Sequence, residues 1–98
     1  MLDDKLINGI KDICSLYSNI EKVILFGSRA VNKEKYNSDI DLALIGEFDI
    51  LFCERLKLEL SNLPTLLKFD VISYNDIENK ELKDSIDTYG KIIYIKQN

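Results

Sequence analysis

Two short motifs in the first half of the chain carry groups suited to phosphate and metal chemistry. Gly27 and Ser28 directly follow the apolar run 23–26, and Asp39 and Asp41 open a second apolar run after ten intervening residues. A Gly-Ser turn after a strand offers backbone N–H groups and a hydroxyl to an anion. Two carboxylates two residues apart on a strand point to the same face. The two motifs together indicate phosphoryl or nucleotidyl transfer.

A third carboxylate, Asp70, interrupts the apolar run 66–73. If that run pairs with the strand that begins at Asp39, Asp70 reaches the same face of the sheet. Two unit charges ~4 Å apart repel by about 4 kcal/mol at an effective dielectric constant of roughly 20. Three such groups favour a divalent cation, and ligands that are all oxygen favour Mg²⁺ or Mn²⁺. The alternative is that Asp39 and Asp70 are ordinary strand-end or solvent-facing residues.

The residues around the Gly-Ser turn allow structural as well as functional interpretations. Ser28 is a phosphate ligand, a helix cap or both, because the two roles are compatible. Arg29 is either a phosphate contact or a solvated helix residue. Lys33 and Lys35 are expected on a solvated face.

The elements that must position these residues follow from the apolar pattern, which predicts an α/β (α+β) domain with a small mixed sheet and helices packed on it. The strand at 21–26 has almost no polar interruption, so we expect it at the centre of the sheet. Segment 91–96 is expected to be a further strand or an extended tail, and a candidate edge for association. The pattern predicts helices over 3–18, 28–35, 49–60 and 81–89, and strands over 21–26, 39–45 and 66–73.

Length and composition limit the classes of function. The 98 residues fit one domain, 1–98, and the net charge of −4 weighs against direct binding to nucleic acid. Cys14 and Cys53 are expected to be buried thiols, because the chain has no CxxC spacing and no histidine. The N-terminus lacks the features of a signal peptide, and no apolar run approaches the ~18 residues of a membrane span. We therefore expect a cytoplasmic protein with no membrane contact.

The motif Phe-Gly-Ser-Arg-Ala from Phe26, followed by Ser-Asp-Ile-Asp-Leu-Ala-Leu from Ser38, resembles the minimal nucleotidyltransferase family of the DNA polymerase β superfamily. The resemblance covers nearly the whole chain and implies the polymerase β-like nucleotidyltransferase fold. The short length points to the minimal, stand-alone group of this superfamily.

The resemblance also implies a role for each motif residue. Gly27 and Ser28, with Arg29 beside them, would bind the triphosphate of ATP, the substrate. Asp39 and Asp41 would bind two Mg²⁺ ions. Asp70 would bind the catalytic ion of the two and would help to activate the acceptor hydroxyl. The chemistry is attack on the α-phosphate with release of pyrophosphate. All three acidic positions are present, so we expect an active enzyme.

One departure concerns triphosphate binding. Many relatives have a second Arg and a Gly where this chain has Val31 and Asn32. Either the affinity for triphosphate is weaker, or Lys33 or Lys35 substitutes for the missing arginine.

The minimal group resembles the antitoxin half of toxin–antitoxin pairs, whose partner is a helical HEPN-domain ribonuclease. The implied function is transfer of AMP from ATP to a tyrosine of that toxin, within a homo- or hetero-oligomer. The first alternative is nucleotidylation of a small molecule such as an aminoglycoside. The second alternative is a non-catalytic antitoxin that neutralises its partner by binding, with a vestigial metal site.

Overall fold

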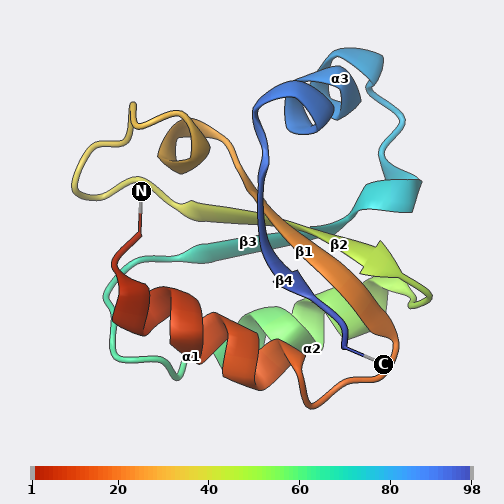
Figure 1. The fold of residues 1–98 in the computed structure, drawn as a ribbon, viewed down its shortest axis with the longest axis horizontal. Helices are drawn as coiled ribbons and strands as arrows, with labels where there is room; N and C mark the ends of the chain where they lie inside the picture. The colour runs from red at the N-terminus through yellow and green to blue at the C-terminus, as the bar shows by residue number, and fades with distance from the viewer. Residues whose placement is uncertain (1, 98) are drawn as a thin grey trace.

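A computed structural model describes residues 2–97 as a four-stranded sheet with helices on both faces (Figure 1). The fold is therefore mixed α/β, as the apolar pattern predicts. In chain order the elements are α1 (Asp4–Cys14), β1 (Ile20–Phe26), the 3₁₀ turn η1 (Ser28–Ala30), β2 (Ile40–Gly46), α2 (Ile50–Leu60), β3 (Phe69–Ser73), the 3₁₀ turn η2 (Tyr74–Asp76), α3 (Lys80–Tyr89) and β4 (Lys91–Ile95).

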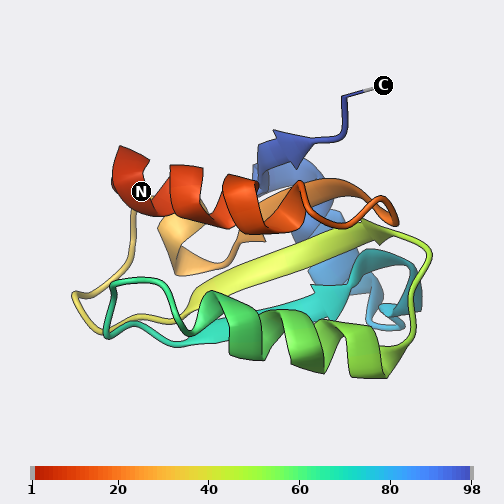
Figure 2. The same ribbon diagram turned by 90° about the horizontal axis from the view of Figure 1, so that it is seen from below.

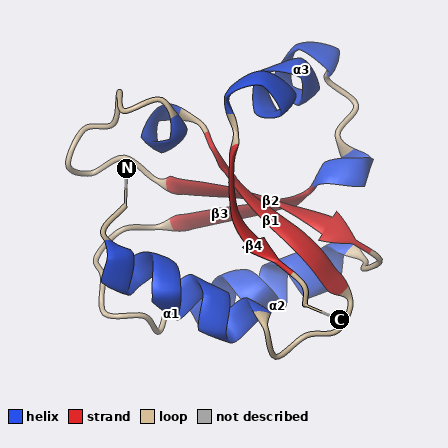
Figure 3. Ribbon diagram, viewed as in Figure 1, coloured by secondary structure: helices blue, strands red, loops and turns tan. Residues whose placement is uncertain are grey.

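The sheet has the strand order β3-β2-β1-β4 (Figure 3). β1 runs antiparallel to both β2 and β4, whereas β2 and β3 are parallel and are connected through α2. The prediction that the first strand is central is confirmed. Segment 91–96 forms a strand rather than a tail, and β3 and β4 are the two edges of the sheet.

Helices α1 and α2 pack on one face of the sheet, and α3 lies on the other (Figure 2). The larger core lies under α1 and α2, because alternate strand residues such as Leu25, Leu42 and Val71 point to that face. The smaller core lies under α3 and centres on Ile24, Ala43 and Ile86. The side chains of β2 and β3 that do not belong to the larger core therefore face α3.

Each α-helix begins at a side chain that accepts a backbone hydrogen bond. Asp3 accepts from the Leu6 N–H at 2.8 Å and caps α1. The matching caps of α2 and α3 are Asp49, which accepts from Phe52 N–H at 2.9 Å, and Asn79, which accepts from Leu82 N–H at 3.0 Å. Such caps satisfy N–H groups that have no partner within the helix.

The predicted helix over 28–35 is wrong. Only η1 forms there, and residues 31–39 make a loop. Asn32 adopts a φ of 58°, the left-handed conformation that ends a right-handed helix. The Lys33 N–H then donates to the Ser28 carbonyl at 2.9 Å, so the chain folds back on the turn.

Three predicted boundaries also differ. α1 ends at Cys14, because the backbone turns sharply through residues 15–18 to reach β1. β3 begins at Phe69 rather than 66, and Leu66 is fully exposed. β2 begins at Ile40, so Asp39 lies in the preceding loop.

Among the described residues, Cys14 and Cys53 are free thiols and both are buried, as predicted. The longest helices, α1 and α2, have 11 residues each, and no helix in the described range is long and apolar enough to cross a membrane.

Candidate active site

A row of three register partners crosses the sheet at the end where β2 begins. Phe26 of β1 is the partner of Asp41 in the antiparallel pair, and Asp41 is the partner of Asp70 in the parallel pair. Both carboxylates lie on the α3 face, because their neighbours in the strands, such as Leu42 and Val71, point into the larger core. Pairing of the second and third predicted strands thus brings Asp41 and Asp70 together.

Gly27 extends this row beyond the end of β1. It has a φ of 77°, which L side chains rarely adopt, and a Cβ at this position would overlap Asp41 Oδ2. The Asp41 carboxylate therefore lies directly against the Gly27 backbone. Both constraints require glycine here, and together they place a peptide group beside an acidic side chain.

The pKa of the Asp41 carboxyl is raised by burial and by the neighbouring acidic residues. Burial, as the largest cause, and the charges of Asp70 and Asp39 together raise this pKa from 3.8 to about 6. The side chain is half-buried, whereas Asp39 and Asp70 are exposed. Ionised Asp41 is thus repelled by two acids, and a cation at this place would relieve that repulsion.

Asp39 is held in the loop by hydrogen bonds on both sides of it. The Arg29 Nε–H donates to the Ser38 carbonyl at 3.0 Å, and the Ile40 N–H donates to the Lys68 carbonyl at 2.8 Å. Ser38 also accepts from the Lys35 N–H through its hydroxyl at 2.9 Å. The backbone around Asp39 is therefore fixed to η1 on one side and to the approach to β3 on the other.

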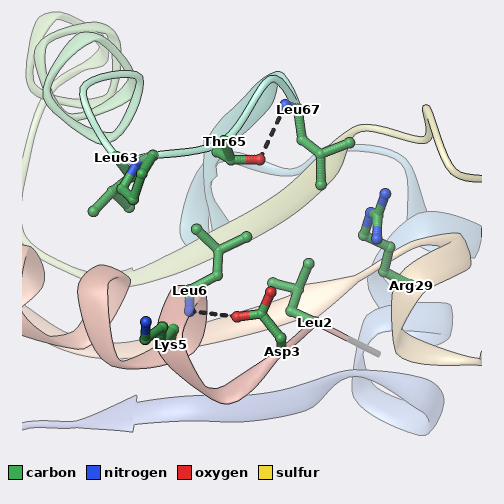
Figure 4. Close-up of a pocket in the computed structure, with 9 residues that line it drawn as sticks. Leu2, Asp3, Lys5, Leu6, Arg29, Leu63, Thr65 and Leu67 are labelled. Carbon is green, nitrogen blue, oxygen red and sulfur yellow. Dashed lines mark hydrogen bonds between the residues drawn. The ribbon is translucent and has the colours of Figure 1, made fainter.

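Arg29 is buried, with 6% of its side chain exposed, so it is not a solvated helix residue. It lines a pocket with Leu2, Leu6 and Leu67, on the side of the sheet that α1 covers (Figure 4). This side chain positions the loop before Asp39. A contact between Arg29 and a phosphate stays a prediction.

A hollow of about 560 Å³ opens beside the Gly-Ser turn, between η1 and α3. Lys33 lines this hollow together with Gly27, and its substitution for the missing arginine stays a prediction. Gly27, rather than Ser28, occupies the N-cap position of η1, which removes the helix-cap interpretation of Ser28. The other lining residues are Phe26, Val31, Ser85, Tyr89 and Gly90.

The acidic residues suit a divalent cation in donor type and in charge. Carboxylate oxygens are the ligands that Mg²⁺ prefers, and the raised pKa of Asp41 indicates uncompensated negative charge. Within residues 2–97, however, no three His, Cys, Asp or Glu side chains lie close enough together to coordinate one ion. The structure brings Asp41 and Asp70 into register and leaves Asp39 outside the strand.

The family model described as "Polymerase beta, Nucleotidyltransferase" matches residues 8–98. The chain belongs to this nucleotidyltransferase family. A search of curated proteins found no match. The family match agrees with the mixed sheet of the structure.

Solved structures share the fold of this nucleotidyltransferase. A chain of a toxin–antitoxin complex with AMP-PNP is 23% identical, with a TM-score of 0.74 over 98% of this chain and 76% of that chain. A chain from a tri-AMPylated Shewanella oneidensis HEPN toxin in complex with an MNT antitoxin is 21% identical, with a TM-score of 0.74 over 98% and 75%. A protein proposed to be a minimal nucleotidyltransferase is 25% identical, with a TM-score of 0.71 over 90% and 92%.

Two backbone groups that fix the candidate site were not predicted from the sequence. The carbonyl of Ser38 anchors Arg29, and the carbonyl of Lys68 anchors the start of β2. Backbone groups carry no side-chain signal, so neither contact has a sequence pattern. The position of Ser38 in a run of turn-forming residues was the available signal for a fixed turn.

Proposed function

We propose that this nucleotidyltransferase transfers AMP from ATP to a tyrosine hydroxyl of a HEPN-domain ribonuclease, and that it thereby acts as an antitoxin. The observation that carries the proposal is the row of Gly27, Asp41 and Asp70 across three neighbouring strands. Solved complexes with the same fold support it, because one contains AMP-PNP and another a tri-AMPylated HEPN toxin. Since ATP is the substrate, we place the reaction in the cytoplasm.

The triphosphate binds at the Gly27 end of the row. The positive φ of Gly27 opens the turn, so backbone N–H groups and the Ser28 hydroxyl can face a phosphate oxygen. Lys33 lines the adjacent hollow and adds a positive charge. These groups would hold the pyrophosphate that leaves.

Asp39, Asp41 and Asp70 would hold two Mg²⁺ ions. Bound Mg²⁺ supplies charge neutralisation at the α-phosphate and orients it for in-line attack. Asp41 must be ionised to serve as a ligand, so protons compete with Mg²⁺ for this carboxyl, whose pKa burial and the neighbouring acids raise. Arg29 acts through the backbone, because its hydrogen bond to Ser38 fixes the loop that carries Asp39.

The acceptor approaches on the Asp70 side. The tyrosine oxygen forms a bond to the α-phosphorus while the bond from that phosphorus to the pyrophosphate oxygen breaks. The phenolic proton passes to the Asp70 carboxylate, which is exposed and therefore accessible to a hydroxyl. The products are AMP-tyrosine and pyrophosphate.

The test is incubation with ATP labelled at the α-phosphate, Mg²⁺ and the protein encoded by the neighbouring gene. We expect label on a tyrosine of that protein with the wild-type enzyme, and none with Asp70→Asn at unchanged melting temperature. Exposed Asp12→Asn serves as the matched control and retains transfer.

Other outcomes would replace the proposal. A tight complex without label, unaffected by Asp39→Asn together with Asp41→Asn, would identify a binding antitoxin. Label on an added aminoglycoside, with none on protein, would identify a small-molecule nucleotidyltransferase. Full transfer by Asp70→Asn would remove Asp70 from the site.

A further inference from the structure

A groove of about 440 Å³ runs along the outer edge of β3, beginning at Asp70. Four consecutive strand residues, 70–73, line it, although consecutive side chains point to opposite faces of a sheet. A groove that touches all four must therefore lie along a strand edge. β3 is an edge strand whose other edge pairs with β2 (Figures 1 and 3). The groove therefore follows the free edge of β3.

The lining of this β3-edge groove is apolar with acidic side chains. Its apolar part comes from α2, β3 and the segment that leads to α3, through Ile50, Cys53, Val71, Ile72, Ile77 and Leu82. Its carboxylates are Glu54, Asp70, Asp76 and Glu78, and no Lys or Arg is among the residues that line it. Glu54, Asp76 and Glu78 are exposed and lie outside the proposed metal ligands, so their charge remains when Mg²⁺ is bound.

The direction of the reaction places the acceptor at this groove. The pyrophosphate leaves toward Gly27 and Ser28, beyond the end of β1. The attacking oxygen must approach from the opposite side of the α-phosphorus, because the displacement is in line. On the sheet, the side of Asp41 opposite β1 is β3, where Asp70 and the groove begin.

We propose that the β3-edge groove binds an extended, basic segment of the acceptor protein, which adds to β3 as a fifth strand and presents its hydroxyl to Asp70. This inference rests on the proposed function. An edge strand offers unpaired N–H and C=O groups that fix an added strand, and alternate side chains of that strand can enter the apolar lining. The carboxylates select arginine and lysine, and they repel the phosphates of a nucleic-acid acceptor.

The probe is a short synthetic peptide with a central tyrosine, flanking valines and an arginine at each end. Three matched peptides each carry one change. The first has glutamates in place of the arginines, the second has N-methyl groups on the backbone along one edge, and the third has phenylalanine in place of the tyrosine. Binding is measured by fluorescence anisotropy, with and without Mg²⁺ and AMP-PNP. We expect the basic peptide to bind about tenfold more tightly than the acidic one, as two surface ion pairs allow. We expect the N-methylated peptide to lose binding and the phenylalanine peptide to keep it.

Charge reversal in the groove is the matched test on the protein. Glu54→Lys with Glu78→Lys should abolish the preference between the basic and acidic peptides, because the two lysines offset the charges of Asp70 and Asp76. Glu21→Lys with Glu47→Lys makes the same charge change at exposed positions that line a different hollow, and it should leave the preference unchanged. Circular dichroism checks that both variants are folded.

The proposal is overturned if the wild type shows no preference, if both double variants lose it equally, or if the N-methylated peptide binds as well as its parent. The proposal is also overturned if an aminoglycoside displaces the peptide and accepts AMP, because the acceptor is then a small cationic molecule. If the protein still prefers the basic peptide but does not bind AMP-PNP, the groove is supported and the proposed function is contradicted. If it binds AMP-PNP but shows no preference between the peptides, the groove is contradicted and the proposed function is supported.

Discussion

Asp41 and Asp70 are register partners in the parallel pair of β2 and β3, and both point to the α3 face. Neighbouring strands lie about 4.8 Å apart, so the two carboxyl groups interact directly through space. Burial, reinforced by the charges of Asp70 and Asp39, raises the pKa of the half-buried Asp41 to about 6. Asp70, at the edge strand, remains open to solvent and to an acceptor.

This raised pKa gives the stability of the protein a specific pH dependence. In the folded state Asp41 takes up a proton near pH 6, whereas in the unfolded chain it does so near 3.8. Protonation therefore stabilises the fold below 3.8, and this stabilisation is lost as the pH rises through 6. Asp41→Asn, which is always neutral, should be more stable than wild type by about 1 kcal/mol near pH 7, after allowance for the exposed part of the side chain. Thermal unfolding at several pH values measures this, and an advantage of Asp41→Asn that grows below pH 5 would contradict the assignment.

Metal binding should stabilise the wild type through the acidic residues. At a Mg²⁺ concentration of about 100 times the dissociation constant, the expected gain is about 2.7 kcal/mol. The double variant Asp39→Asn with Asp41→Asn should show no gain, because it lacks two of the three carboxylates. Differential scanning fluorimetry with a Mg²⁺ titration measures the shift. Asp12→Asn with Glu21→Gln, at exposed positions elsewhere, is the control and should behave as wild type; equal shifts in all three proteins would place the metal at another site.

Substitution of Gly27 should damage both the fold and the reaction. Gly27→Ala introduces a Cβ into the space of Asp41 Oδ2 and leaves a residue with an unfavourable φ, a strain of about 1–3 kcal/mol. We expect a lower melting temperature and loss of nucleotidyl transfer. Gly9→Ala is the comparison, because there the new methyl meets the end of the flexible Leu63 side chain and the residue lies within α1. Full activity of Gly27→Ala would show that the Gly-Ser turn does not bind the substrate.

Arg29 offers a test between positioning and phosphate binding. Arg29→Met removes the hydrogen bond to the Ser38 carbonyl and should lower the free energy of unfolding by about 1–3 kcal/mol. It should also weaken Mg²⁺ binding, because the loop before Asp39 loosens, and leave binding of metal-free tripolyphosphate unchanged. Isothermal titration calorimetry of both ligands distinguishes the roles. Loss of tripolyphosphate affinity at wild-type stability would assign Arg29 to the phosphates instead.

The sequence was informative where one local pattern decides the structure. The two-residue period of the strand 40–45 places Leu42 and Asp41 on opposite faces, and in the structure Leu42 lies in the larger core. The apolar stripe of α1 and its Asp3 cap are likewise local features. The loop 31–39 was not predictable in this way, because its turn depends on the conformation of Asn32 and on backbone bonds to Ser28.

The site required information that is not local. The sequence alone does not determine the register that pairs Asp41 with Asp70. That register depends on how α2, which connects the two strands, packs on the sheet. The burial of Arg29 was also not predicted, because its partner is the Ser38 carbonyl, nine residues further along the chain, which comes close only when the loop folds back. Residue types predicted the chemistry, and the tertiary structure determined which groups meet.

The parallel pairing of β2 and β3 also determines when the protein becomes competent during its synthesis. Gly27 and Asp41 leave the ribosome well before Asp70, and β3 can join β2 only after α2 has formed between them. Such non-local strand pairing forms more slowly than a hairpin like that of β1 and β2. A nascent chain that ends before β3 therefore holds the antiparallel hairpin without Asp70, and the pair of Asp41 and Asp70 is complete only once the crossover through α2 has formed.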